Sequence, residues 1–424
     1  MKSLMALALA GSLMSTTAFA GTLTVWTRMS AEGAKPMFDA FEKAHPDIDL
    51  EVEYIPGGKN HINKLIAAVA ADTPPDFTTL DVVATEAFAN LGALKPLDEI
   101  IASHPALSLD QFPKGPTRTG QFDGKQYAVP FGGDGSFVVY NKAIFRERGL
   151  DPENPPRTWD EFTKAAQQLT FDRNGDGQPD VYGMLFVPSI PSLATFHWLP
   201  YLWMAGGDVI DRDKGEFVFA SDAGAKALGF LMDLHLKANA VPPSAIGAAG
   251  DSDYLVDFLQ GRVAMTFAGG SITQRAKRDA PDLELGIMPH PSPDAQTSGT
   301  SFSGGDNVAI MAAIPGERLN DAITLMEWLV SKDGQSKWLE TKFFRPVRLD
   351  MLQDPHFETN PLEKQALEAY FSAHEPPVTS HYVEVQQYLR DAFEEVSFGM
   401  ADPATALGKA QQRANALIKR SGRM

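Results

Sequence analysis

Residues 22–54 read TLTVWTRMSAEGAKPMFDAFEKAHPDIDLEVEY and decide the fold, because they place a strand, a helix and a second strand in succession. A short apolar strand is expected over 23–26. Ser30 then caps an amphipathic helix that Pro46 ends. Over 48–54, apolar residues alternate strictly with Asp and Glu, which predicts a strand with one buried face.

The same alternation of strand and helix continues beyond this stretch. A helix is expected over 60–71 and a strand over 77–81, followed by a further short helix. Such an order predicts an α/β fold with a largely parallel sheet and helices on both faces. Ligands of these sheets bind beyond the carboxyl ends of the strands. We therefore expect Trp26, Arg28 and Asp81, at two of these strand ends, to face one crevice.

The later chain follows a similar pattern. Thr158 and Glu161 have the spacing of a helix capping box, and Asp402-Pro403 has the sequence of a helix start. Further strands are expected over 263–267, 284–288 and 307–311, and mainly helix from about residue 320 onward.

The N-terminus has the features of a secretory signal peptide. Lys2 precedes an apolar stretch over 4–13, and Ala18-Phe19-Ala20 provides a small-x-small cleavage pattern before Gly21. This stretch is too short to span a bilayer of ~30 Å. An uncut membrane anchor is the alternative. We expect cleavage after Ala20 and a soluble protein in the periplasm, where candidate functions are binding, hydrolysis or lysis.

Composition narrows the partners. Removing Lys2 from the net charge of −17 leaves −18 on the mature chain, so nucleic acid and anionic membrane surfaces are disfavoured as partners. The sequence has no cysteine, which excludes disulfides, thiolate catalysis and a lipidated cysteine. The length predicts two or three lobes with sizeable cores.

Short motifs then point to a family. GKQYAVP at 124–130, followed by VYNK at 139–142, resembles the G-x-x-Y-x-x-P and Y-N-K signature of family 1 extracellular solute-binding proteins, the maltodextrin-binding-protein-like receptors of carbohydrate ABC importers. Further similar segments follow in the family's order: TWDEF at 158–162, AGGD at 205–208, FLQGRVAM at 258–265, GG at 304–305, WL at 328–329 and GQ at 334–335. The resemblance covers nearly the whole mature chain.

The resemblance implies a two-lobed receptor whose chain crosses three times between lobes. Three Gly- and Pro-bearing stretches, at 130–135, 289–305 and 344–347, match that number. We expect lobe 1 to comprise 21–132 and 303–342, and lobe 2 to comprise 133–302 and 343–424.

The function implied is capture of a sugar or sugar derivative and its delivery to ABC permease subunits in the inner membrane. The protein is expected to act as a monomer and to need no cofactor. ATP hydrolysis must belong to another chain, because no G-x-x-x-x-G-K-[ST] motif is present.

Sugar binding calls for flat aromatic side chains and for planar polar groups that bond two hydroxyls. The densest aromatic run is HWLPYLW at 197–203, just before the place where family members have a helix lining the cleft. His197 and Trp198 are therefore candidate ligand contacts, with Trp198 stacking on the sugar. Trp203 is the better candidate for the core, although both tryptophans could be core residues.

Polar candidates come from the strand ends and crossings. Hydroxyl partners are expected from Asp81, Asp306 and Asn307, whereas Arg28 and Arg345 offer charged or bidentate contacts. Backbone amides at Gly133 and Asp134 can approach a ligand closely. For each of these polar candidates the alternative role is structural, either in a surface ion pair or in a turn. Family members often carry a tryptophan after the strand ending at Phe267, where this chain has Ala268, Gly269 and Gly270 instead.

One loop resembles a calcium site. Asp172, Asn174, Asp176, Gln178 and Asp180 occupy positions 1, 3, 5, 7 and 9 of a calcium-binding loop, with Gly177 at position 6. Gly183 stands where the usual bidentate glutamate is found. The alternative is a hairpin rich in Asx turns, and either role is structural.

A secreted carbohydrate-active hydrolase or lyase remains the alternative function. It would need two carboxylates about 5 to 10 Å apart, and 54 acidic residues make some such pair inevitable. Neither a G-x-S-x-G elbow nor an H-E-x-x-H motif occurs. A calcium-dependent structural protein would rest on the single loop.

Overall fold

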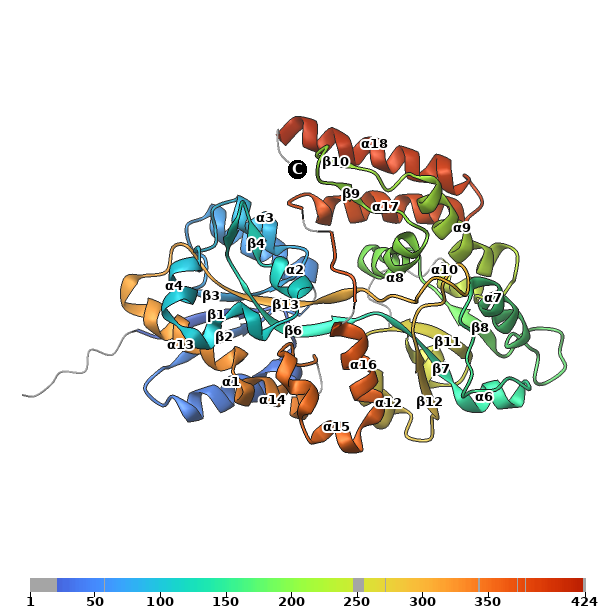
Figure 1. Ribbon diagram of the computed structural model, residues 1–424, viewed down its shortest axis with the longest axis horizontal. Helices are drawn as coiled ribbons and strands as arrows, with labels where there is room; N and C mark the ends of the chain where they lie inside the picture. Colours follow the sequence, from blue (N-terminus) through green and yellow to red (C-terminus); the bar gives the residue numbers. More distant parts are fainter. Residues whose placement is uncertain are drawn as a thin grey trace, which may run out of the picture.

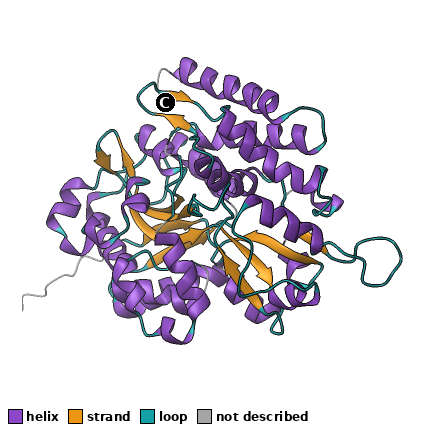
Figure 2. Cartoon of the chain, turned by 45° about the vertical axis from the view of Figure 1, so that its right-hand side comes forward, coloured by secondary structure: helices purple, strands orange, loops and turns teal. Residues whose placement is uncertain are grey.

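The computed structural model describes residues 21–56, 58–246, 255–270, 272–341, 344–371, 373–377 and 379–421. Two lobes lie side by side in Figure 1, each built around its own sheet. Helices surround both sheets (Figure 2). The α/β two-lobed architecture predicted from the sequence is therefore confirmed. The expectation of largely parallel sheets is wrong, because four of the seven strand pairings described in the two large sheets are antiparallel. None of the helices in these ranges combines the length and apolar character that a membrane span requires.

The sheet of lobe 1 has five strands. Their order is β2 (Leu50–Tyr54), β1 (Leu23–Thr27), β3 (Phe77–Asp81), β13 (Ser303–Ile310) and β6 (Val129–Gly135). β1 pairs in parallel with β2 and β3, whereas β13 runs antiparallel to β3 and β6. β13 begins at Ser303 rather than at the predicted Asn307. The prediction missed its first residues because two of them are glycines, which have a low strand propensity, although they pair with β6.

Helices cover both faces of this sheet. They are α1 (Ala31–Ala44), α2 (Gly58–Ala70), α3 (Thr85–Asn90), α4 (Asp98–Ser103), α5 (Lys114–Arg118), α13 (Leu319–Val330) and α14 (Lys332–Thr341). The lobe also contains 3₁₀ turns at Pro105–Leu107, Leu109–Gln111 and Gly316–Arg318, and a hairpin of β4 (Gln121–Phe122) and β5 (Lys125–Gln126). As predicted, Ser30 caps α1, its side chain accepting from the Gly33 amide. One apolar cluster fills the α1, α13 and α14 face, and a second fills the α2 and α3 face.

Lobe 2 has a four-stranded sheet in the order β12 (Leu285–Met288), β7 (Phe137–Asn141), β11 (Val263–Ala268) and β8 (Tyr182–Leu185). β11 and β8 are parallel, and β7 is antiparallel to both β11 and β12. The lobe also contains α6 (Lys142–Glu147), α7 (Trp159–Gln168), α8 (Pro191–Met204), α9 (Asp222–Leu236), α10 (Pro243–Ile246), α11 (Leu255–Leu259), α12 (Ile272–Asp279), α17 (Tyr382–Ser397), α18 (Pro403–Ser421) and a hairpin of β9 (Ile210–Asp211) and β10 (Glu216–Phe217). The capping box of Thr158 and Glu161 is formed at α7, as predicted.

The chain joins the lobes through extended segments. β6 of lobe 1 leads through Ser136 directly into β7 of lobe 2, and β13 returns from lobe 2 to lobe 1 (Figure 1). After α14, Arg345 forms an antiparallel bridge with Gly133 of β6. The three crossings therefore lie together.

The third connection is long. It comprises a 3₁₀ turn (Leu349–Gln353), α15 (His356–Thr359), α16 (Pro361–Phe371) and an extended stretch that leads to α17. α16 packs Leu367 and Tyr370 into the core of lobe 1 and Ala366 into a cluster that includes residues of β7 and β11. The lobe boundaries given above stay a prediction.

Candidate functional site

Charged side chains meet where three strands of lobe 1 reach the crossings. Arg28 follows β1, Asp81 ends β3, and Asp306 lies opposite Asp81 on β13. The Arg28 Nε donates to Asp306 Oδ1, and Arg28 Nη1 lies 3.5 Å from Asp81 Oδ2. Arg28 and Asp81 therefore lie at the same edge of the sheet, as predicted.

Arg28 and Asp306 change each other's pKa, and the charge of Asp81 affects both. Burial raises the pKa of Asp306 to about 7, with a further increase from Asp81 and an opposing effect of Arg28. Burial lowers the pKa of Arg28, but Asp306 and Asp81 outweigh it and hold that pKa above its ordinary value. Asp306 Oδ2 is buried without a hydrogen-bond partner in the described part of the chain.

Asp134 and Arg345 extend the cluster towards lobe 2. Asp134 Oδ1 accepts from the amides of Gly135 (2.9 Å) and Gly270 (2.8 Å), and Arg345 Nη2 donates to the Gly270 carbonyl (2.8 Å). Gly133 contributes its backbone, which pairs with that of Arg345. We call Arg28, Asp81, Asp134, Asp306 and Arg345 the charged cluster. Burial raises the pKa of Asp134, whereas the charges of Arg345 and Arg28 lower it.

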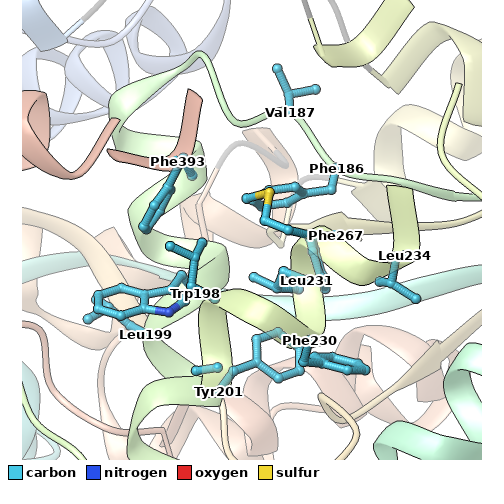
Figure 3. Packing of buried hydrophobic residues seen from close by; sticks show 14 of the residues in the cluster. Phe186, Val187, Trp198, Leu199, Tyr201, Phe230, Leu231, Leu234, Phe267 and Phe393 are labelled. Atoms are coloured by element: carbon cyan, nitrogen blue, oxygen red, sulfur yellow. The ribbon is translucent and has the colours of Figure 1, made fainter. Parts of the chain in front are cut away.

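The aromatic run on α8 is arranged differently from the prediction. Trp198 is fully buried and packs edge-on against Phe393 of α17, with ring centroids 5.4 Å apart (Figure 3). Its burial corrects the expectation that Trp198 stacks on a ligand. Trp203, expected in the core, is half-buried and stacks on His374 of the third connection at 4.0 Å.

His197 is also a core residue. It is buried against Phe267, with ring centroids 4.6 Å apart, and burial lowers its pKa well below the usual value. A neutral, enclosed imidazole packs against the lobe 2 sheet, which corrects the expectation that it contacts a ligand.

Two further candidates serve lobe 1 itself. Asn307 is fully buried, and its Nδ2 donates to Thr85 Oγ1 and Thr119 Oγ1, both at 3.0 Å. Both of its donor positions are thereby used within the lobe, so Asn307 is structural. Trp26 lies half-buried beneath Lys64, whose Nζ is 4.4 Å from the ring centroid. Trp26 is not part of the charged cluster, because its ring packs against the apolar cluster on the α2 and α3 face of the sheet.

A cavity of about 620 Å³ opens between the lobes, away from the residues that the sequence singled out. It is lined by Glu86, Arg118, Gln121, Phe122, Asp123 and Gly124 of lobe 1 and by Arg212 of lobe 2. We call it the inter-lobe cavity. Sequence reasoning missed these residues because they come from separate segments, although the GKQYAVP motif begins at its edge.

Charged groups of both lobes meet at the inter-lobe cavity. Burial raises the pKa of Glu86 to about 7, partly offset by Arg212 and by the Ser380 amide, which donates to Glu86 Oε1 at 3.2 Å. Arg118 Nη1 forms an ion pair with Glu375 Oε1 at 2.8 Å. The third connection therefore contacts lobe 1 beside this cavity.

Residues 36–365 match the sequence model of the bacterial extracellular solute-binding protein family. The chain belongs to this family. The match confirms the resemblance drawn from the motifs, and it assigns this solute-binding protein to a family whose members are binding proteins of transporters and are periplasmic or extracellular.

Relatives of this solute-binding protein match it over nearly the whole length of both chains, at low sequence identity. The sn-glycerol-3-phosphate-binding periplasmic protein UgpB of Pectobacterium atrosepticum is 24% identical over 428 residues, 96% of this chain and 94% of that protein. A solute-binding protein of an ABC transporter from Thermotoga lettingae, solved with α-D-tagatose, is 28% identical, with a TM-score of 0.81 over 94% of this chain and 99% of its own. UgpB from Mycobacterium tuberculosis, solved with glycerophosphocholine, is 20% identical and shares the fold, with a TM-score of 0.79 over 95% and 99% of the two chains.

In the loop at 172–180, which resembles a calcium site, backbone amides of the loop donate hydrogen bonds to its own carboxylates. Asp172 accepts from the amides of Asn174, Gly175 and Gly177, and Asp180 Oδ2 accepts from those of Arg173 and Asn174, at 2.6–3.1 Å. Among the described residues no group of three or more His, Cys, Asp or Glu side chains is placed to hold a metal ion. These hydrogen bonds form Asx turns, and calcium binding by the loop stays a prediction.

Proposed function

We propose that this protein is the substrate-binding component of an ABC importer and that it captures a sugar or sugar derivative between its lobes. The observation that carries the proposal is the inter-lobe cavity, which is lined by both lobes and whose volume of about 620 Å³ lies in the usual range for small-molecule sites. Its guanidinium, carboxylate and amide groups suit a ligand rich in hydroxyls.

The names of similar proteins support the ligand class. The Thermotoga lettingae structure holds α-D-tagatose, and the UgpB relatives are named for sn-glycerol 3-phosphate. We extend the site from the inter-lobe cavity to the charged cluster, where Asp81 and Asp306 offer acceptors for hydroxyl groups. No catalytic step is part of the proposal.

The mechanism is capture by closure. A ligand that contacts both lobes favours the closed state by its differential affinity for that state. The closed, loaded protein then delivers its ligand to the permease in the inner membrane. The protein acts as a monomer in the periplasm after cleavage behind Ala20, without nucleic acid as a partner.

A thermal-shift screen over neutral sugars, polyols, and phosphorylated and sulfonated sugars tests this function. A true ligand raises the melting temperature, reduces the radius of gyration in small-angle scattering, and is recovered unchanged by chromatography. Release of a cleaved product would instead support the hydrolase or lyase alternative. Scattering curves that stay the same with every compound would contradict closure.

A further inference from the structure

Two glycines after β11 leave room for charged side chains from the crossings. A Cβ atom on Gly270 would lie 1.6 Å from Arg345 Nη1, and a Cβ atom on Gly269 would lie 2.4 Å from Asp134 Oδ1. Since real Cβ atoms do not approach this closely, any other residue at position 270 must displace the guanidinium. Arg345 therefore occupies the space that a side chain at position 270 would fill.

The guanidinium is held firmly in that space. The backbone of Arg345 exchanges two hydrogen bonds with Gly133, at 2.8 and 2.9 Å. Its Nη2 donates to the Gly270 carbonyl, and its Cζ lies 5.5 Å from the centroid of the Phe137 ring. With only 6% of the residue exposed, the group is preorganised before any ligand arrives.

One end of this guanidinium lacks an acceptor. Arg345 Nη1 is buried and has no hydrogen-bond partner within the described ranges. No hydrogen bond among the described residues joins Nη1 to a nearby carboxylate. Asp134 Oδ1 accepts from two amides, and Glu363 bonds His356 and Lys277. In agreement, burial lowers the pKa of Arg345 to about 10, despite the opposing effects of Asp134 and Glu363. Leaving a charged donor unsatisfied is costly, so this atom calls for an oxygen acceptor.

An unpartnered acceptor belongs to the same cluster. Asp306 Oδ2 is buried and has no partner in the part of the chain that the structure describes. The backbone of Asp306 pairs with Gly132, whose neighbour Gly133 forms a bridge with Arg345. A hydroxyl group both donates and accepts, so hydroxyl-bearing ligands match this combination.

We propose that Arg345 is a specificity-determining residue that donates from Nη1 to an oxygen atom of the bound substrate, and that Gly270 is required as the positioning residue that admits it. The inference rests on the proposed function and on the extension of its site to the charged cluster, because Arg345 does not line the inter-lobe cavity in this structure. The shared chemistry of the ligand is an oxygen acceptor, from a sugar hydroxyl or from an anionic group. A rival occupant is water, because a cavity of about 20 Å³ beside Gly270 and Arg345 has room for one molecule.

Titration calorimetry on the full chain tests the assignment, with α-D-tagatose and sn-glycerol 3-phosphate as the neutral and anionic probes together with any compound that raised the melting temperature. Arg345→Gln is expected to raise the Kd at least tenfold for the compound that binds. Gly270→Ala should have a similar effect, because its methyl group displaces the guanidinium. Arg348→Gln is the matched control from the same segment. Its partners are Gln111 and Val330 of lobe 1 and the neighbouring Asp350, so its Kd should stay within about twofold of wild type.

Arg345→Lys and a structure of the complex cover the case in which Arg345→Gln does not fold. Lysine keeps the positive charge but lacks the planar guanidinium with its several N–H donors, so Arg345→Lys should still weaken binding. The complex should show a ligand oxygen within hydrogen-bond distance of Nη1. Unchanged affinity in folded variants, or water instead of ligand at Nη1, would overturn the assignment while leaving the proposed function intact. If wild type bound no compound at all, the proposed function would fail and the assignment with it.

Discussion

Arg28 and Asp306 form an ion pair between segments 278 residues apart in the chain. Asp306 contributes a side chain with no exposed surface, and Arg28 one that is 20% exposed. Asp81 Oδ2 lies 3.5 Å from Nη1 of the same guanidinium. The pair thus joins β1, β3 and β13 at the point where the crossings leave lobe 1.

Arg28→Gln is expected to lower the free energy of unfolding by about 3 kcal/mol, because it removes the cation that pairs with the buried Asp306. Urea denaturation at neutral pH measures the loss. Lys35→Gln removes an exposed helical pair with Asp39 and should cost less than about 0.5 kcal/mol. Small and equal losses in the two variants would mean that the buried pair does not stabilise the fold.

Gly305→Ala should destabilise the crossing of β13. Gly305 has φ +123°, and a Cβ atom there would lie 2.0 Å from the Gly132 carbonyl oxygen, so we expect a loss of more than about 2 kcal/mol in thermal or chemical unfolding. Gly408→Ala is the matched control, since it lies within α18 with open space around it. That variant should gain about 0.5–1 kcal/mol. Similar effects in both would show that the close approach at Gly305 is relieved cheaply.

Local sequence signals were sufficient for the fold of lobe 1. Ser30, the alternation before Tyr54 and the short apolar strand at Phe77 each specify one element through capping or periodicity. Because parallel strands end at the same edge, those signals also placed Arg28 beside Asp81. The element bounds were less accurate where glycines continue a strand, as in β13.

The orientation of α8 could not be deduced in the same way. This helix carries apolar side chains on all sides, so its sequence has no polar face to distinguish the core from the cleft. The choice between Trp198 and Trp203 was therefore made wrongly. The inter-lobe cavity was missed for a related reason, since Glu86, Arg118 and Arg212 are brought together only by tertiary structure.

Trp198→Ala should therefore act on stability. Removing this fully buried ring is expected to cost about 3–5 kcal/mol, measured by urea denaturation, and to leave the Kd of the folded fraction unchanged. Trp203→Ala, at a half-buried position against His374, should cost clearly less. A large rise in Kd for a folded Trp198 variant would restore the stacking role that the sequence suggested.

The loop at 172–180 should be stabilised by its own hydrogen bonds. Asp172→Ala removes three amide contacts and is expected to lower the melting temperature only slightly, because water at this solvated site replaces part of what the bonds contribute. The melting temperatures of wild type should agree in excess calcium and in excess chelator. A calcium-dependent rise that Asp172→Ala abolishes would instead establish the loop as a calcium site.

Ligand affinity should depend on the protonation of Glu86. In this structure burial raises its pKa to about 7 from an ordinary value of 4.5, and we expect separation of the lobes to expose the side chain again. Closure therefore binds a proton, so it is favoured at low pH and weakens as pH rises through about 7. The Kd should rise on the order of tenfold from about pH 6 to about pH 8, measured by calorimetry. Glu86→Gln should lose most of this dependence, whereas Glu384→Gln, at an exposed position on α17, should keep it. A wild-type Kd that stays flat across this range would show that Glu86 does not change its environment on closure.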